Sequence, residues 1–388
     1  MSEIKKLIER LCPDGVEYIE LGVIAQVIRG ERITKRDLVE DGEYPVMSGG
    51  VSYFGRYTNY NREANTITVA QYGSAGYVSF IKEKFWANDV CYSVLPSERL
   101  NNKYCYYVLC NLQNTLYSLT TKAIPDCLPK EKLTSLEIPV PPIEVQSKIV
   151  EILDNFTELE AELEAELEAR RKQYEYYRDN LFCKSTDIKK IGDLTKVFSC
   201  PRVFRNQWKK SGIPFWRSSD VMSYHNGVKN PRGEVYISQS LYLELSRKSE
   251  RIEKGDLLVT GGGSIGMPYL KMDDNPLFVK DADLICIKRC DSFIPSYLYH
   301  FFFTTEFRTY LKKITHDATI AHYTINQIKD TPIPIPPLSE QQRIVSILDR
   351  FEALTTDLQS GLPAEIEARR KQYEYYREKL LTFKQKSA

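Results

Sequence analysis

The sequence lacks any long apolar run. Hydrophobic residues make up 42% of its 388 positions and charged residues 27%, but no stretch approaches the roughly 18 apolar residues that a membrane helix needs. The start of the chain, MSEIKKLIERLCPDG, is charged throughout and has no apolar centre, so it does not resemble a signal peptide. These two absences predict a cytoplasmic protein that does not enter a membrane.

Cysteine and histidine are placed in a way that does not favour a metal site. The nine cysteines are an odd number without a C-x-x-C pair, and the closest spacings, Cys105 with Cys110 and Cys286 with Cys290, are too wide for a zinc knuckle. We therefore expect reduced thiols, no structural metal and no cofactor. All histidines lie in the second half of the chain, so a role shared by both halves cannot depend on one. They are His225, His300, His316 and His322.

Two segments approach catalytic motifs without matching them. The stretch TGGGSIG (260–266) lacks the lysine of a phosphate-binding loop, and its counterpart QYGSAG (71–76) favours a tight turn between strands in which glycine has a positive φ. The tetrapeptide NPLF (275–278) departs from the N-P-P-[YF] signature of amino-methyltransferases at Leu277, and no F-x-G-x-G loop for S-adenosylmethionine accompanies it. G-x-S-x-G and H-E-x-x-H are also missing. The sequence therefore predicts no catalytic residue.

Charge is balanced over the whole chain but unevenly distributed along it. The formal net charge is +1, yet residues 183–332 contain 23 Lys and Arg against 16 Asp and Glu, whereas residues 147–182 contain 5 against 10. A basic segment is compatible with nucleic-acid binding, and equally with an uneven solvated surface. The length of the chain exceeds one ordinary core and predicts at least two domains.

An internal repeat dominates the sequence. IPVPPIEVQSKIVEILDNFTEL (138–159) matches IPIPPLSEQQRIVSILDRFEAL (333–354) at an offset of 195, and EARRKQYEYYRDNL (168–181) matches EARRKQYEYYREKL (367–380) at an offset of 199. Matches of this length do not arise by chance, so we infer that an ancestral unit of about half the chain was duplicated. The change of offset means four extra residues between 355 and 366, where Gly361 and Pro363 are expected to kink or break a helix.

Each repeat predicts a proline-rich extended segment followed by a long helix. The prolines exclude a helix at the start of each block, and apolar residues then recur mainly three and four positions apart, as in a coiled coil. We expect the two helices, at 144–186 and 339–388, to pack antiparallel and to relate the two halves by a pseudo-twofold. The predicted seam of the first helix is Ile149, Ile152, Phe156, Leu159, Leu163, Leu167, Tyr174 and Tyr177. The predicted seam of the second is Ile344, Ile347, Phe351, Leu354, Leu358, Tyr373 and Tyr376.

The rest of the chain forms two diverged modules of mixed α and β texture. Alternating stretches such as TITVAQYG (66–73) and DLLVTGGG (256–263) indicate strands. We place the first module at 1–143, with a short N-terminal helix, and the second at 187–338. The predicted fold class is α+β, with two globular domains separated by two long antiparallel helices. The landmarks that pair the modules are EYP (43–45) with GIP (212–214), GSAG (73–76) with GSIG (263–266), and KYCYYVL (103–109) with SYLYHFF (296–302).

Basic residues cluster at matching places in the two modules. One cluster is IRGERITKRD (28–37), and the other is CPRVFRNQWKK (200–210), where Phe204 and Trp208 are interleaved. Such clusters are typical of solvated loops and, as often, of loops that contact phosphates. In TIAHYT, His322 beside Tyr323 is a further candidate to contact a base, with a surface or core position as the alternative. The candidate contacts are Arg29, Arg32, Lys35, Arg36, Arg202, Arg205, Lys209, Lys210, His322 and Tyr323.

The order module–helix–module–helix resembles the specificity subunit of prokaryotic type I restriction-modification systems. The resemblance rests on P-x-P-P-[IL]-x-[EV]-Q-x-[KR]-I-V-x-I-L-D at 139–154 and 334–349, on R-R-K-Q-Y-E-Y-Y-R at 170–178 and 369–377, and on LCPDGVEYIELG (11–22). It covers essentially the whole chain. It implies that each module is a target-recognition domain reading one half of a bipartite, asymmetric site in double-stranded DNA. It also implies that the helices set the spacing of these domains.

The resemblance implies partners as well. Two methyltransferase subunits would dock on the helices and motor-nuclease subunits would join them, so that catalysis belongs to the partners and this chain is not an enzyme. Two other functions stay open. A DNA methyltransferase with its own recognition domains would need a cofactor loop and an intact N-P-P-[YF]. A coiled-coil adaptor without DNA specificity would leave two large diverged modules without a purpose.

Overall fold

The computed structural model of the protein describes residues 2–121, 124–183, 187–228, 233–315, 322–356 and 361–386. The chain divides into unit 1, Met1–Glu162 with Ile366–Ala388, and unit 2, Leu163–Glu365. One boundary falls inside α6 (Ile143–Phe182), which therefore contributes to both units. The domain limits predicted from the sequence placed the long helices outside the two modules. In the structure, unit 1 includes the first half of α6 and residues 366–388, and unit 2 includes the second half of α6. No helix among the described residues has the length and apolar character needed to cross a membrane.

Unit 1 contains two sheets and a strand pair. Its strands are β1 (Tyr18–Glu20), β2 (Ala25–Arg29), β3 (Tyr44–Met47), β4 (Gly55–Tyr57), β5 (Thr66–Ala70), β6 (Val78–Ile81), β7 (Trp86–Ala87), β8 (Cys91–Pro96) and β9 (Glu137–Pro139). Its other helices are α1 (Ser2–Leu11), α2 (Leu21–Ile24), α3 (Asn102–Asn111), α4 (Gln113–Ser118), α5 (Lys130–Thr134) and α14 (Leu362–Leu381). The four-stranded antiparallel sheet has the order β2–β8–β5–β6, the three-stranded sheet β4–β3–β7, and β1 pairs with β9. Every residue of the inner strand β5 is buried.

Unit 2 repeats this arrangement. Its strands are β10 (Ile188–Lys190), β11 (Val197–Phe198), β12 (Ile213–Trp216), β13 (Tyr236–Ile237), β14 (Leu257–Thr260), β15 (Pro268–Leu270), β16 (Phe278–Val279), β17 (Leu284–Ile287) and β18 (Pro332–Pro334). Its helices are α7 (Ile191–Leu194), η1 (Arg205–Gln207), α8 (Ser218–His225), α9 (Gln239–Leu245), α10 (Pro295–Phe301), α11 (Thr305–Thr315), α12 (Ile325–Asp330) and α13 (Leu338–Thr356). The sheets have the orders β11–β17–β14–β15 and β13–β12–β16, and β10 pairs with β18.

The two units therefore share one topology. Each strand of unit 1 has a counterpart at the same place in unit 2, and the strand pairs β3–β7 and β12–β16 are both parallel. The landmarks read from the sequence fall on corresponding elements: EYP and GIP lead into β3 and β12, and KYCYYVL and SYLYHFF form α3 and α10. Both units are thus copies of one mixed α+β domain.

The glycine-rich stretches form the predicted turns between strands. Gly73 and Gly76 have φ of 77° and 88°, and Gly263 and Gly266 have φ of 73° and 71°, a region that favours glycine. The turns join β5 to β6 and β14 to β15 and are closed by the same bond, from Gly76 N to Ala70 O at 2.8 Å and from Gly266 N to Thr260 O at 2.7 Å. TGGGSIG is therefore a structural turn.

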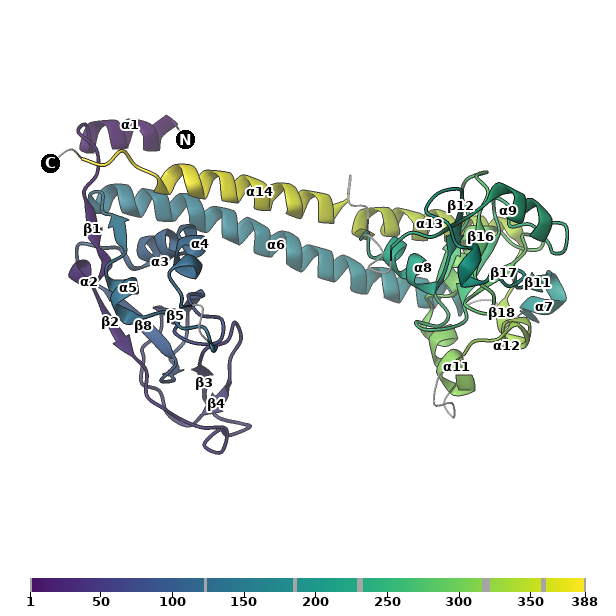
Figure 1. Ribbon diagram of the computed structural model, residues 1–388, viewed down its shortest axis with the longest axis horizontal. Helices are drawn as coiled ribbons and strands as arrows, with labels where there is room; N and C mark the ends of the chain where they lie inside the picture. Colours follow the sequence, from purple (N-terminus) through teal and green to yellow (C-terminus); the bar gives the residue numbers. More distant parts are fainter. Residues whose placement is uncertain are drawn as a thin grey trace. The chain divides into compact units, whose positions relative to one another are not determined.

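In unit 1, the first half of α6 packs antiparallel to α14 (Figure 1). The ring of Phe156 stacks on Tyr376 with centroids 5.4 Å apart and lies 6.5 Å from that of Tyr373. Glu160, one turn further along α6, forms an ion pair of 2.5 Å with Arg370, one turn earlier along α14. Contacts that advance along one helix and retreat along the other define an antiparallel pair.

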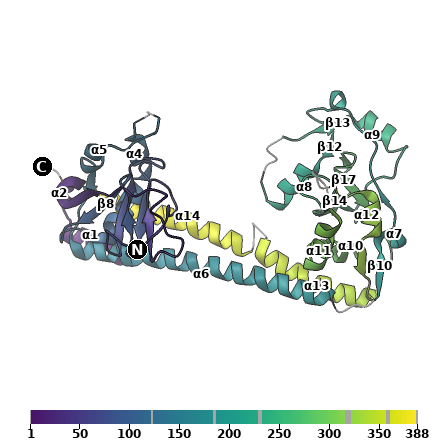
Figure 2. The same cartoon turned by 90° about the horizontal axis from the view of Figure 1, so that it is seen from below.

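In unit 2, the second half of α6 packs in the same manner against α13 (Figure 2). Phe351 of α13 lies 6.4 Å from the ring of Tyr174 and stacks on Tyr177 at 5.6 Å. Beyond these rings, the end of α6 and the start of α13 share a core with α10, through Phe182 and Ile344 among others. α13 is described as far as Thr356, and α14 begins at Leu362. Gly361, directly before α14, is not helical, so the second long helix is interrupted at the place that Gly361 and Pro363 predict.

The seam needs correction at particular positions. Leu159, Tyr177 and Leu354 are 44%, 41% and 37% exposed and so do not lie in a closed seam, while Leu358 lies outside the described residues. Leu153 and Leu348, which the seam left out, are fully buried. The reason is that these helices present one apolar face to the partner helix and a second to their own domain, so the apolar stripe is divided between two partners. Ile149 and Ile344 join the domain cores, and Ile152, Leu163, Leu167 and Ile347 are half-buried.

Candidate nucleic-acid interface

The basic cluster of unit 1 forms a loop, residues 29–37, that leaves the end of β2. We call it basic loop 1. Its backbone is held by the buried Asn88, whose Oδ1 accepts from Ile33 N at 3.1 Å and whose Nδ2 donates to Ile33 O at 3.2 Å. Glu31 N adds a bond to Ala87 O at 2.8 Å. The loop is therefore fixed on the connection between β7 and β8.

The tip of basic loop 1 is closed by a local turn. The Thr34 amide and hydroxyl donate to the same oxygen of Asp37 at 2.7 and 2.8 Å, and these bonds hold the pKa of Asp37 below its ordinary value. Arg32, Lys35 and Arg36 are exposed around this turn. Arg29 Nε donates to Asp89 O at 2.5 Å, and its side chain is also exposed. The four cations thus project from an ordered backbone.

The basic cluster of unit 2 forms residues 199–210, which we call basic loop 2. It leaves the end of β11 and is held on the connection between β16 and β17, where Ala282 N donates to Ser199 Oγ at 3.2 Å and Arg202 Nε lies 3.7 Å from Asp281 Oδ2. Lys209 exchanges two backbone bonds with Tyr236. The anchor corresponds in topology to that of basic loop 1.

Aromatic rings organise the cations of basic loop 2. The guanidinium of Arg205 lies 5.7 Å from the ring centroid of Trp208, and that of Arg217 lies 5.9 Å from it, within the range of cation–π attraction. Phe204 is 60% exposed and lies beside Arg202 at 5.9 Å. Lys209 and Lys210 are exposed next to them. The two loops therefore share their place and charge but differ in shape.

Tyr323 is not available as a base contact, and this prediction is wrong. The residue is fully buried, its hydroxyl hydrogen-bonds Thr331, and its backbone N donates to Gly261 O at 2.9 Å. Burial raises the pKa of the Tyr323 hydroxyl. Its counterpart is Leu128, also fully buried, whose N donates to Gln71 O. By the 195-residue offset, position 323 corresponds to position 128, which is a leucine. This correspondence is the signal that would have identified Tyr323 as a core residue.

His322, in contrast, is exposed and borders two concave regions of unit 2. One, of about 600 Å³, also contains Ser199 and Asp281 at the base of basic loop 2. The other, of about 570 Å³, contains Gly262, Arg217 and Lys280. Its cations are paired, Arg217 with Asp220 at 3.1 Å and Lys280 with Asp283 at 2.9 Å. His322 therefore lies between the basic loop and a polar hollow.

Other candidate chemistry resolves into structural roles. Leu277 and Phe278 of NPLF are buried core residues. Among the described residues, one group of three side chains, His300, Asp349 and Glu352, has the spacing of metal ligands. His300 Nε2 lies 2.7 Å from Asp349 Oδ1, and the corresponding Tyr107 donates to Asp154 at 2.6 Å. The bond from His300 therefore joins α10 to α13 in unit 2 as the bond from Tyr107 joins α3 to α6 in unit 1.

Sequence reasoning missed the residues that hold the two loops and the helices in place. Asn88 and Asp281 carry no signal in the sequence, because their role depends on loops distant along the chain. The buried Gln146 and Gln341 lie inside the repeated blocks, and each makes three side-chain bonds to backbone groups of its own unit. A polar residue repeated inside an apolar stripe was the available signal.

Comparison with known proteins identifies the family. The model of the type I restriction modification DNA specificity domain matches residues 13–169 and 184–368. A putative type I restriction enzyme specificity subunit of Haemophilus influenzae, S.HindORF215P, is 34% identical over 405 residues, which cover 99% of this chain and 100% of that protein. The EcoR124I/EcoR124II specificity subunit of Escherichia coli is 30% identical over 410 residues, covering 99% and 98%.

A solved structure agrees at the level of the fold. The S subunit of a type I restriction-modification system from M. genitalium superposes with a TM-score of 0.59 at 18% identity, covering 95% of this chain and 96% of that one. The repeated α+β units and the family match lead to one assignment. The chain belongs to the family of type I restriction-modification DNA specificity subunits.

Proposed function

We propose that each unit reads one half of a bipartite, asymmetric site in double-stranded DNA, and that the loops anchored on the β7–β8 and β16–β17 connections make the contacts. The observation that carries this proposal is the pair of basic loops. They leave the same strand of the same topology and rest on the same connection, yet differ in sequence and in shape. A common position with different side chains is what two readers of different half-sites require.

Within basic loop 2, the cations divide by how they are held. Arg205 is oriented by Trp208, and a pre-oriented guanidinium is suited to bidentate contact with a guanine edge or a phosphate. Lys209 and Lys210 are exposed point charges, which suit phosphates. His322 lies at the edge of the polar hollow and is the remaining candidate for a base contact.

The helices are proposed to serve as a common scaffold for partners. The R-R-K-Q-Y-E-Y-Y-R block occurs in both units, and its exposed tyrosines, Tyr176 and Tyr375, are 66% and 57% exposed. Two equal surfaces fit two copies of one methyltransferase subunit. Motor-nuclease subunits then join, and methylation, ATP hydrolysis and cleavage belong to these partners in the cytoplasm, where the DNA lies.

The length of α6 is proposed to set the unread spacer between the half-sites. One ELEA unit adds four residues, about 6 Å of helix, which corresponds to one or two base pairs at ~3.4 Å each. Inserting ELEA after Ala169, or deleting 162–165, is expected to change the spacer and to leave both half-sites unchanged. Mapping methylated sites tests this. An unchanged spacer would show that α6 does not set the spacing.

DNA selection by the assembled complex tests the function as a whole. The chain, with and without its methyltransferase subunit, is mixed with a randomised DNA pool and the bound sequences are read. We expect two conserved half-sites separated by a spacer of fixed length. Methyl transfer by the isolated chain would favour the enzyme alternative. Assembly without any sequence selection would favour the adaptor.

A further inference from the structure

Basic loop 2 carries an exposed aromatic side chain that basic loop 1 lacks. Phe204 is 60% exposed and lies between Arg202 and Arg205 in the sequence. Basic loop 1, RGERITKRD, contains no aromatic residue, and its one apolar side chain, Ile33, is buried. An exposed ring at this place is therefore specific to unit 2, and a side chain that differs between two related readers is a candidate for what makes them read different sequences.

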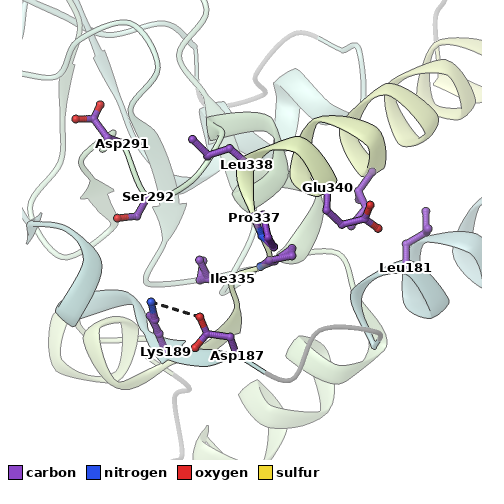
Figure 3. Close-up of a pocket in the computed structure, with 11 residues that line it drawn as sticks. Leu181, Asp187, Lys189, Asp291, Ser292, Ile335, Pro337, Leu338 and Glu340 are labelled. Carbon is purple, nitrogen blue, oxygen red and sulfur yellow. Dashed lines mark ion pairs between the residues drawn. The ribbon is translucent and has the colours of Figure 1, made fainter.

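Leu338 shows how exposure of an apolar side chain can instead belong to the common scaffold. It is 50% exposed at the start of α13 and borders a concave region of about 650 Å³ (Figure 3). By the 195-residue offset it corresponds to Ile143 at the start of α6, which is also 50% exposed. Exposure at that position is shared by both units, whereas Phe204 lies in a segment where the two units have diverged.

The backbone at Phe204 is ordered by a reciprocal pair of hydrogen bonds. Phe204 N donates to Gln207 Oε1 at 2.9 Å, and Gln207 N donates to Phe204 O at 2.9 Å. These bonds close the short helix η1, and Trp208 N donates to Arg205 O at 3.3 Å. Because the turn is already formed in the free chain, the loop does not have to be ordered when it binds a ligand.

A second aromatic ring supports the turn from the side of the core. Trp208 packs against the buried Phe215 of β12, with ring centroids 6.0 Å apart. The loop thus directs one aromatic ring to the core and leaves the other in solvent. Since Trp208 and Gln207 hold the turn, removal of the Phe204 ring is expected to leave the fold of unit 2 intact.

Cations lie beside the exposed ring. The guanidinium of Arg202 lies 5.9 Å from the ring centroid of Phe204 and is held near Asp281 at 3.7 Å. Arg205, the next residue after Phe204, is oriented by Trp208. Proteins that kink DNA insert an apolar side chain such as Phe between base pairs, while neighbouring cations hold the phosphate backbone. Basic loop 2 presents both kinds of group on one ordered turn.

We infer that Phe204 inserts between two adjacent base pairs of the half-site that unit 2 reads and partly unstacks them. The inference rests on the proposed function, which brings basic loop 2 to the DNA. The steps TA and CA/TG are the easiest to unstack. Phe204 therefore selects such a step in this half-site without a hydrogen bond to either base. Basic loop 1, which has no exposed ring, makes no such selection.

Insertion differs measurably from a contact at the edge of a base. A phenyl ring that touched the methyl group of thymine in the major groove would leave the base pairs stacked. Loss of stacking at one step is therefore the property to measure, and 2-aminopurine, which replaces adenine and fluoresces more strongly when it is unstacked, reports it at single positions.

The fluorescence experiment uses the full chain with its methyltransferase subunit. The site is first selected from a randomised DNA pool, and 2-aminopurine then replaces each adenine of both half-sites in turn, on either strand, so that every TA and CA/TG step is probed. We expect the complex to raise the fluorescence at one such step. Phe204→Ala is expected to abolish this rise, and Phe204→Leu, which keeps a bulky apolar side chain, to retain most of it. The adenine that the methyltransferase extrudes should respond with all three proteins.

Affinity for the selected site provides a second measurement. Phe204→Ala is expected to weaken binding about tenfold, because the contact between the ring and a base is lost. The slope of log K against log salt concentration should not change, because no charge is removed. The matched control is Leu243→Ala on α9, an apolar side chain of unit 2 that is 41% exposed, and it should change neither affinity nor fluorescence. Both variants should keep the Tm of the unmodified chain.

The outcomes separate this inference from the proposed function. If two half-sites are selected but neither contains a TA or CA/TG step, or no step shows a rise that depends on Phe204, the inference is overturned and the proposed function stands. Equal losses of affinity in Phe204→Ala and Leu243→Ala, or a lower salt slope in Phe204→Ala, overturn it as well. Failure of the complex to select any DNA sequence overturns both.

Discussion

Replacing Gln341 by leucine is expected to destabilise unit 2 strongly. The side chain is fully buried at the start of α13. Its Oε1 accepts from Ile294 N at 2.9 Å, and its Nε2 donates to Ser292 O at 3.1 Å and to Pro336 O at 2.8 Å. One amide thus ties the proline-rich segment and the turn before α10 to the helix. Leucine retains most of the volume and removes all three bonds.

The magnitude follows from the groups that are left behind. A buried backbone group without a partner costs about 1–3 kcal/mol, and Gln341→Leu leaves one N–H and two carbonyls in that state. Allowing for local relaxation and for the apolar gain of leucine, we expect a loss of roughly 3 kcal/mol in the free energy of unfolding. For a unit of this size, that corresponds to a fall in Tm of about 6–12 °C.

Calorimetry and hydrogen exchange on the full chain measure this effect. The matched control is Gln342→Leu, an exposed neighbour, which should stay within about 0.5 kcal/mol of the unmodified protein. Gln146→Leu removes the equivalent three bonds in unit 1 and should raise exchange there. If Gln341→Leu proves as stable as its control, the three bonds do not hold the segment. If it loosens both units equally, the cores are not independent.

Three further changes test other parts of the structure. Replacing Arg205, Lys209 and Lys210 of basic loop 2 by alanine should weaken DNA binding by at least about tenfold. The slope of log K against log salt concentration should fall by roughly one for each phosphate that is no longer bound. An unchanged slope in an anisotropy titration would show that the loop does not contact DNA. Tyr323→Phe removes a buried bond to Thr331 and should cost about 1 kcal/mol in thermal unfolding without altering DNA affinity. The pKa of Asp37 is lower in the folded protein than its ordinary value of 3.8. The ionised carboxylate therefore stabilises the turn fully above that ordinary pKa, and this stabilisation is lost as the pH falls through the lower pKa of the folded state. Thr34→Val should raise that pKa in an NMR titration, and an unchanged value would contradict the role of the turn.

The scaffold could be predicted from the sequence because its signals are local. Apolar residues three and four positions apart predict α6, and Gly361 with Pro363 predicts the break before α14. The glycines of GSAG and GSIG predict turns because a positive φ is a property of single residues. The two basic loops could be placed at matching positions because they follow the first strand of each large sheet.

The rest depends on interactions between distant parts of the chain. Periodicity shows that Leu159 is on an apolar stripe but not whether a partner covers it, and in the structure it is 44% exposed. Tyr323 is placed by its bond to Gly261, which lies about sixty residues earlier in the sequence.

Unit 1 consists of two segments that are distant in the sequence, and this has a consequence for its folding during synthesis on the ribosome. Val16 exchanges backbone bonds with Lys384 and Lys386, and α14 supplies the rings that cover Phe156. The first domain to leave the ribosome is therefore incomplete until residues 366–388 emerge. At ~5–20 residues per second, the intervening residues 163–365 take on the order of 10–40 seconds to make. During that time the apolar face of the first half of α6 is without its partner, and a chain that stops early would carry this exposed face permanently.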